Sequence, residues 1–196
     1  MVRSYGDREE TLKPAVLPDS VLTEIGRLIR AFAEIEDLIN LYLCGLAQIN
    51  ESKALVLLGR TAITRRIEMA EYLALMTGDA ISATHKEIFN SGFREALECR
   101  NAVAHGLLLG RTDDDRFAFL TAKTEIPSGP SAVQLAISYH EASISAYAKL
   151  ATDAIPQIEA RLKLEDMRAA RLQRPLLPHR KAQRQRAPSA KPQPRP

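Results

Sequence analysis

The residue types that could perform chemistry gather in one short run, from Arg100 to Gly106. In this run the arginine is followed directly by Asn101 and, five positions after the arginine, by His105. A guanidinium binds phosphate oxygens through paired hydrogen bonds, and an imidazole gains or loses a proton near neutral pH. An amide beside them can orient either group. We therefore expect any catalytic residues of this protein to be Arg100, Asn101 and His105.

The spacing of polar residues predicts that this run ends a helix. At about 100° per residue, one polar stripe is formed by Arg94, Glu98, Asn101 and His105. Arg100 projects instead from the apolar face of the same helix, where an unpaired guanidinium would be costly. The sequence therefore requires a partner for Arg100, or a cleft that opens beside it.

A carboxylate in the first predicted helix offers that partner. Glu36 lies inside the apolar stripe of this helix, and Asn40 follows it one turn later. We predict that Glu36 approaches Arg100 where the two helices meet. A second interpretation stays open, because a buried Arg–Glu pair can serve only to set helix register. A histidine before a glycine can likewise serve only to end a helix.

Apolar residues at helical spacing predict four long helices. Their expected ranges are 19–48, 52–76, 80–105 and 132–170. Between the last two, apolar runs on either side of a polar turn predict a β-hairpin with strands at 107–109 and 117–120. We therefore predict an all-α fold, an up-and-down bundle of four helices with a short β-hairpin before the last one.

The distribution of charge divides the chain into a body and a tail. Residues 1–167 hold all 24 acidic residues and 18 of the 27 basic ones, whereas residues 168–196 hold nine basic residues and no acidic one. The tail is also rich in proline, which predicts disorder. We divide the chain into a flexible arm over 1–18, a helical domain over 19–170 and a disordered basic tail over 171–196.

Two groups of basic residues could contact a polyanion. The tail could attract phosphate backbones without sequence preference, or bind an acidic protein. Arg60, Arg65 and Arg66 of the second predicted helix could add to an RNA-binding rim. They are equally consistent with solvated side chains or with ion pairs to Glu68 and Glu71.

The composition argues against several other classes of protein. Cys44 and Cys99 are too few for a disulfide framework or a paired-cysteine metal site. The turn Asp113–Asp115 lacks the spaced ligands of a calcium loop and is typical of a charged hairpin turn. We expect no metal and no cofactor. Because no signal peptide and no membrane-spanning run is evident, we expect a cytoplasmic protein without a membrane partner.

The run Arg100-Asn101-Ala102-Val103-Ala104-His105 resembles the signature of the HEPN superfamily, R-x4-6-H with a polar residue directly after the arginine. The long first helix with an inward Glu36, and the motif at the end of the third helix, also fit. The resemblance covers roughly residues 19–165 and implies a small helical domain. Many members are metal-independent ribonucleases of toxin–antitoxin and phage-defence systems, and they dimerise so that two motifs face one cleft.

The resemblance also implies a role for each residue of the run. Arg100 would bind the scissile phosphate, His105 would transfer a proton or position the phosphate, and Asn101 would orient the ribose or the imidazole. Because RNA carries its own nucleophile, the 2′-hydroxyl, the expected products are a 2′,3′-cyclic phosphate and a 5′-hydroxyl. The residues expected to support this site are Glu36, Asn40, Arg94 and Glu98.

The expected partners are RNA, a second copy of the chain and an antitoxin or regulatory protein. The alternative is a non-catalytic helical module of the same type, which binds nucleic acid or a protein and keeps the motif for packing. A solvated cleft that holds Arg100 and His105 of two protomers would favour the enzyme. A sealed contact between Arg100 and Glu36 would favour the module.

Overall fold

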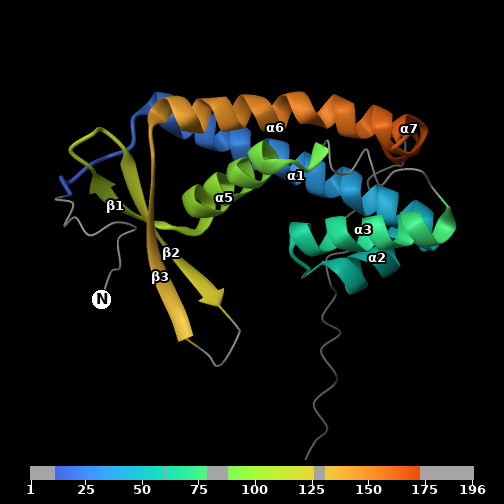
Figure 1. The fold of residues 1–196 in the computed structure, drawn as a ribbon. Helices are drawn as coiled ribbons and strands as arrows, with labels where there is room; N and C mark the ends of the chain where they lie inside the picture. Colours follow the sequence, from blue (N-terminus) through green and yellow to red (C-terminus); the bar gives the residue numbers. More distant parts are fainter. Residues whose placement is uncertain (1–11, 60, 79–87, 126–130, 173–196) are drawn as a thin grey trace, which may run out of the picture.

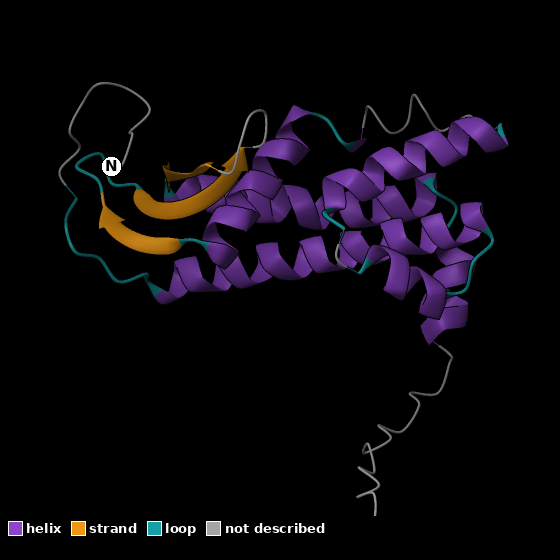
Figure 2. Cartoon of the chain, turned by 90° about the horizontal axis from the view of Figure 1, so that it is seen from below, coloured by secondary structure: helices purple, strands orange, loops and turns teal. Residues whose placement is uncertain are grey.

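The computed structural model describes residues 12–59, 61–78, 88–125 and 131–172, which form a mainly helical fold with one small antiparallel sheet (Figure 1). The helices are α1 (Asp19–Ala47), α2 (Glu51–Leu58), α3 (Ile63–Thr77), α5 (Ser91–His105), α6 (Glu141–Arg161) and α7 (Glu165–Leu172). The strands are β1 (Leu107–Arg111), β2 (Phe117–Glu125) and β3 (Ser131–Tyr139). The sheet lies at one end of the helices (Figure 2).

Helix α1 is the axis of the fold, and α2, α3, α5 and α6 all pack against it. Its apolar residues recur at helical spacing, so one face of the helix is hidden along most of its length. Each such side chain that leaves water stabilises the fold by about 1.5–3 kcal/mol. The fully buried ones on α1 include Leu28, Phe32, Ile35, Leu38, Ile39 and Leu43.

The expectation of an up-and-down bundle is wrong for the first and last long helices, because α1 and α6 run parallel (Figure 1). Near their first turns, the Ser20 hydroxyl donates a hydrogen bond to Glu141 over 2.9 Å. Further along, Arg168 forms ion pairs with both Glu34 of α1 and Glu159 of α6. A parallel pair of helices needs a long return of the chain between them, and the sheet supplies part of that return.

The expectation of a single helix over 132–170 is wrong in two places. Residues 131–139 form strand β3, and the helical part is divided at residues 162–164 into α6 and α7. Apolar residues alternate in β3 at Val133, Leu135, Ile137 and Tyr139, which is the period of a strand. The pattern runs directly into that of α6 and was therefore read as its beginning. Strand β3 pairs antiparallel with β2, so the expected hairpin is a three-stranded meander in the order β1-β2-β3.

The expected second helix is also divided. Helix α2 ends at Leu58 and α3 begins at Ile63, with Ala62 in an extended conformation before it. The Thr61 N–H donates to the Leu58 carbonyl over 2.8 Å and closes the turn. Of the expected third helix, α5 supplies the part from Ser91, and the expected stretch 80–87 lies outside the described residues.

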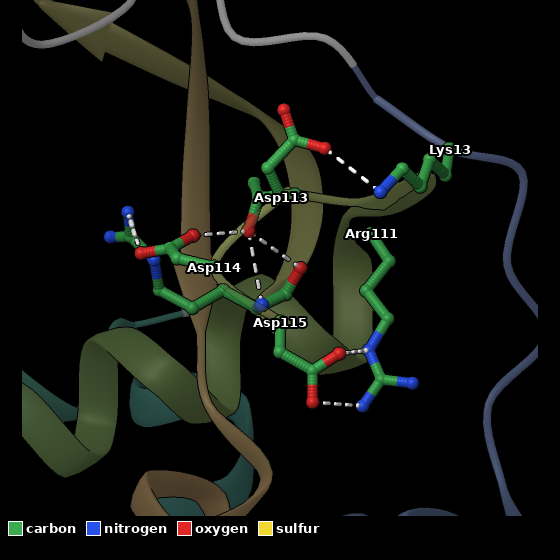
Figure 3. A network of polar contacts seen from close by, with 7 residues as sticks. Lys13, Arg111, Asp113, Asp114 and Asp115 are labelled. Atoms are coloured by element: carbon green, nitrogen blue, oxygen red, sulfur yellow. Dashed lines mark hydrogen bonds and ion pairs between the residues drawn. The ribbon is translucent and has the colours of Figure 1, made fainter.

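The turn between β1 and β2 carries the three adjacent aspartates, and each pairs with a cation (Figure 3). Asp113 lies 2.9 Å from Lys13, Asp115 lies 2.6 Å from Arg111, and Asp114 lies 2.6 Å from Arg116. This confirms the charged hairpin turn expected there. Lys13 also pairs its backbone with that of Arg111, so the chain at Leu12 and Lys13 lies beside the outer edge of β1.

The two ends of the chain were expected to be a flexible arm over 1–18 and a disordered basic tail over 171–196. Residues 1–11 and 173–196 lie outside the described part of the chain. Residues 171 and 172 close helix α7, which reaches two residues further than the expected helical domain. No helix in the described ranges combines the length and the apolar character that crossing a bilayer requires.

Candidate functional site

The expected contact between Glu36 and Arg100 is present. The Arg100 Nη2 donates to the Glu36 Oε1 over 3.3 Å, where α5 packs on α1. The Arg100 side chain keeps 20% of its surface exposed and that of Glu36 keeps 26%. The pair is thus neither sealed in the core nor free in water, and one side of the guanidinium remains accessible.

The accessible side of Arg100 leads to the polar stripe of α5. The Arg100 Nη1 donates to the Asn101 Oδ1 over 3.0 Å, and Asn101 is exposed. One turn further, His105 is exposed as the last residue of the helix. The side chains of Asn101 and His105 share one helical face. In the described ranges no hydrogen bond or ion pair joins His105 to Arg100 or to Asn101.

The other two residues expected to support the site lie on the same stripe. Arg94 and Glu98 are both exposed on α5, as the spacing predicted. Asn40 has its described side-chain hydrogen bond with another arginine of the cluster, Arg66. Its Oδ1 accepts a hydrogen bond from Arg66 Nη1 over 3.2 Å.

Arg66 also contacts Glu36, which the sequence did not predict. It was expected on an RNA-binding rim, in solvent or paired with a glutamate of its own helix, and its side chain is only 8% exposed. Its Nη1 lies 3.6 Å from the Glu36 Oε2, so one carboxylate is shared by Arg66 and Arg100. Arg65, its neighbour, is exposed and pairs with Glu68 as expected, and Arg60 lies outside the described residues.

A signal for the burial of Arg66 was present in the sequence. Helix α3 hides the side chains of Ile63, Arg66, Ala70 and Ala74, which recur at helical spacing. Arg66 therefore belongs to the apolar face of α3 as Arg100 belongs to that of α5. The reasoning that demanded a partner for Arg100 applies equally to Arg66.

The apolar face of α5 holds the motif in place. The Phe93 ring packs on Phe32 of α1 and on Phe89, with ring centroids 5.3 and 5.0 Å apart. Asn90 begins the helix, because its side chain accepts a hydrogen bond from the Phe93 N–H over 3.1 Å. Cys99 is fully buried directly before Arg100, and desolvation raises the pKa of its thiol to about 12.

Gly106 determines how closely the C-terminal end of α5 packs on strand β2. Its N–H donates to the Ala102 carbonyl over 2.8 Å. A Cβ at this position would collide with the Ala102 carbonyl oxygen and would press on Phe119 and the Leu120 carbonyl oxygen of β2. Only a residue without a side chain allows this close approach, so the glycine lets the end of α5 pack directly on β2.

Two cavities of the molecule border α1, and neither is lined by Arg100 or His105. One, of about 310 Å³, opens between α1 and α2 and includes Asp37, Asn40 and Glu51. The other, of about 330 Å³, lies between α1 and α7. Within the described ranges, no group of three or more histidine, cysteine or carboxylate side chains is arranged to hold a metal ion.

The site is therefore a half-buried cluster of Glu36, Arg66 and Arg100, with Asn101 hydrogen-bonded to Arg100 and His105 exposed one turn further along α5. Such an arrangement can hold an anion at Arg100 and exchange a proton at the neighbouring imidazole. Comparison of the chain with protein-family models, with curated proteins and with solved structures finds no match.

Proposed function

We propose that this protein is a metal-independent endoribonuclease of the HEPN type, with Arg100, Asn101 and His105 as its catalytic residues. The observation that carries the proposal is the orientation of Arg100. Glu36 holds one Nη atom of the guanidinium, and the other Nη atom donates to the exposed Asn101. A guanidinium oriented in this way binds a phosphate without first having to be ordered.

The reaction needs few groups because the substrate supplies the nucleophile. The 2′-oxygen of a ribose forms a bond to the adjacent phosphorus while the bond from phosphorus to the 5′-oxygen breaks. One proton leaves the 2′-hydroxyl and one reaches the departing 5′-oxygen, and His105 takes part in this transfer. Arg100 stabilises the charge on the phosphoryl oxygens. The products are a 2′,3′-cyclic phosphate and a 5′-hydroxyl.

The proposal includes a second copy of the chain. Among the described residues no hydrogen bond or ion pair joins Arg100 to His105, and a second motif facing the first would bring more of these groups to one phosphate. We propose a homodimer in which the exposed stripes of two α5 helices border a shared site. Chemical cross-linking through a cysteine introduced at Arg94 tests this arrangement, because Arg94 is exposed on the same stripe.

The deciding experiment is RNA cleavage in the presence of EDTA. Wild-type protein is expected to cut single-stranded RNA, and Arg100→Ala and His105→Ala are each expected to abolish cutting while circular dichroism shows a retained fold. Arg27→Ala is the control, since it removes an exposed cation that pairs with Glu24 on α1, outside the motif and its stripe. Cutting by His105→Ala at the wild-type rate would remove the catalytic assignment.

A second candidate function is favoured by the same ion pair. Because Glu36 and Arg100 join α1 to α5, the motif can act as a packing element of a non-catalytic module that binds nucleic acid or a protein. In that case RNA stays intact at every protein concentration, and Arg100→Ala lowers the melting temperature without affecting any activity.

Under the first proposal, that of a ribonuclease, the protein acts as a toxin or phage-defence effector. An antitoxin or regulatory protein is then a further partner.

A further inference from the structure

We propose that Arg66 is a positioning residue of this site. By sharing Glu36 with Arg100, it leaves the cluster of Glu36, Arg66 and Arg100 with a surplus positive charge, which makes Arg100 a receptor for one phosphate of RNA. The inference rests on the proposed function for the identity of the anion. The role of Arg66 itself is argued from the geometry of the cluster.

The balance of charge is the first observation. Among the described residues, the ion pairs of both guanidiniums are made with the same carboxylate, that of Glu36, at 3.3 Å from Arg100 and 3.6 Å from Arg66. An isolated Glu36–Arg100 pair would be neutral, and its carboxylate would repel an approaching phosphate. With Arg66 on the second oxygen, two cations face one anion. Arg100 therefore keeps attraction for a further anion.

The depth of the two arginines assigns their roles. The Arg66 side chain is 8% exposed, and its Nη1 donates a hydrogen bond to Asn40. Arg66 therefore lies too deep to touch a nucleic acid. The Arg100 side chain is 20% exposed and borders Asn101 on the surface. A substrate phosphate thus contacts Arg100, and Arg66 acts on that phosphate through Glu36.

The unsatisfied donors are an independent observation. The Nε atoms of Arg66 and of Arg100 are both buried and have no hydrogen-bond partner in the described structure. A buried donor without a partner is unfavourable, and a surplus charge beside it adds to the cost. An anion bound at Arg100 offsets the excess of positive charge.

Binding of an RNA that cannot be cut tests the proposal. The probe is a short, fluorescently labelled 2′-O-methyl RNA, and its affinity for the full-length chain is measured by anisotropy at several salt concentrations. Arg66→Gln is expected to weaken binding roughly tenfold at low salt. It should also reduce the slope of log affinity against log salt concentration by about the amount of one phosphate contact. Arg66→Lys keeps the charge and is expected to stay close to wild type.

Two comparisons separate this role from a structural one. Arg65→Gln removes the same charge from the exposed neighbour and is expected to change the affinity by less than about twofold, as for a screened surface charge. The double variant Glu36→Gln with Arg66→Gln restores the original charge balance, and its affinity is expected to return towards wild type. A purely structural contact predicts the opposite, since the double variant then loses more contacts than either single variant.

Equal affinity of Arg66→Gln and Arg65→Gln, or a double variant that binds no better than Arg66→Gln, would overturn the proposal. If Arg66→Gln does not fold, Glu36→Gln replaces it in the comparison. Glu36→Gln carries one more positive charge than the double variant Glu36→Gln with Arg66→Gln, so it must bind the probe more tightly. Equal binding of these two variants overturns the proposal. Cleavage of unmodified RNA by wild type is measured separately. Its absence alongside the expected order of affinities refutes the proposed reaction and leaves the role of Arg66 standing.

Discussion

Glu36 of α1 and Arg100 of α5, 64 positions apart in the chain, meet in an ion pair 3.3 Å long. The pair joins the central helix to the helix that ends in the motif. Both groups are partly withdrawn from water, so their attraction is screened less than that of a surface pair. Their desolvation also costs free energy, so removing one partner leaves the other with part of that cost.

Arg100→Ala is expected to lower the free energy of unfolding by about 1–3 kcal/mol. The loss of stability is smaller than for a buried charge left without any partner, because Glu36 keeps its ion pair with Arg66 at 3.6 Å. Urea denaturation measures the effect, and Arg94→Ala on the exposed face of α5 serves as control with a change of about 0.5 kcal/mol or less. Equal stability of the two variants would show that the Glu36–Arg100 pair contributes nothing to the fold.

Gly106→Ala is expected to destabilise the fold by about 1–3 kcal/mol, because its methyl group would collide with the Ala102 carbonyl oxygen. Gly26→Ala is the matched control. Gly26 lies within α1 with no atom within 4 Å of an added Cβ, so alanine there is expected to stabilise by about 0.5–1 kcal/mol. Thermal melts of the two variants should therefore shift in opposite directions. A Gly106→Ala melt at or above that of wild type would contradict the close approach of α5 to β2.

Cys99 is expected to make stability fall at alkaline pH. Burial raises the pKa of its thiol from 9.0 to about 12 in the folded protein. The unfolded chain therefore loses this proton first, and the stabilisation is lost progressively as pH rises from 9 towards 12. The slope contributed by one such group is at most about 1.4 kcal/mol per pH unit.

Urea denaturation at pH 8 and at pH 10 checks the role of Cys99, with Cys99→Ala as the comparison. The difference in unfolding free energy between the two pH values should be smaller in the variant. Tyr139 adds to the decline in both proteins, because burial raises the pKa of its phenol as well. An identical decline in wild type and Cys99→Ala would assign the whole effect to other groups.

Asp114 is expected to make the hairpin turn sensitive to acid. Hydrogen bonds from Arg116 and Thr112 lower the pKa of the Asp114 carboxyl from 3.8 to about 2. Its stabilisation is therefore complete above pH 3.8 and is lost as pH falls through 2. Asp114→Asn should flatten the dependence of the melting temperature on pH between 4 and 2. Thr112→Val should flatten it in part, whereas Thr112→Ser keeps the hydroxyl and should follow wild type.

Local patterns in the sequence were enough to predict the two elements that carry Glu36 and the motif. The first helix was expected at 19–48 and is observed at 19–47, and the helix of the motif ends at His105 as expected. The partner of Arg100 was predictable for a physical reason. A guanidinium on an apolar face must meet an acceptor, and Glu36 was the carboxylate on the facing stripe.

The strand Ser131–Tyr139 shows where local patterns failed. Its alternating apolar residues run without a break into the pattern of α6, and only pairing with β2 decides between strand and helix. That pairing also reverses the expected direction of the last long helix. A parallel arrangement of α1 and α6 follows from how the chain returns through the sheet, which no window along the sequence contains.

The sequence by itself determined where α1 and the motif helix lie, because helical periodicity depends only on neighbouring residues. Tertiary structure alone decided that Arg66 shares Glu36, while the adjacent Arg65 remains in solvent. The two arginines are chemically identical and differ only in which face of α3 they occupy. Which charges gather around one carboxylate depends on how three separate helices meet.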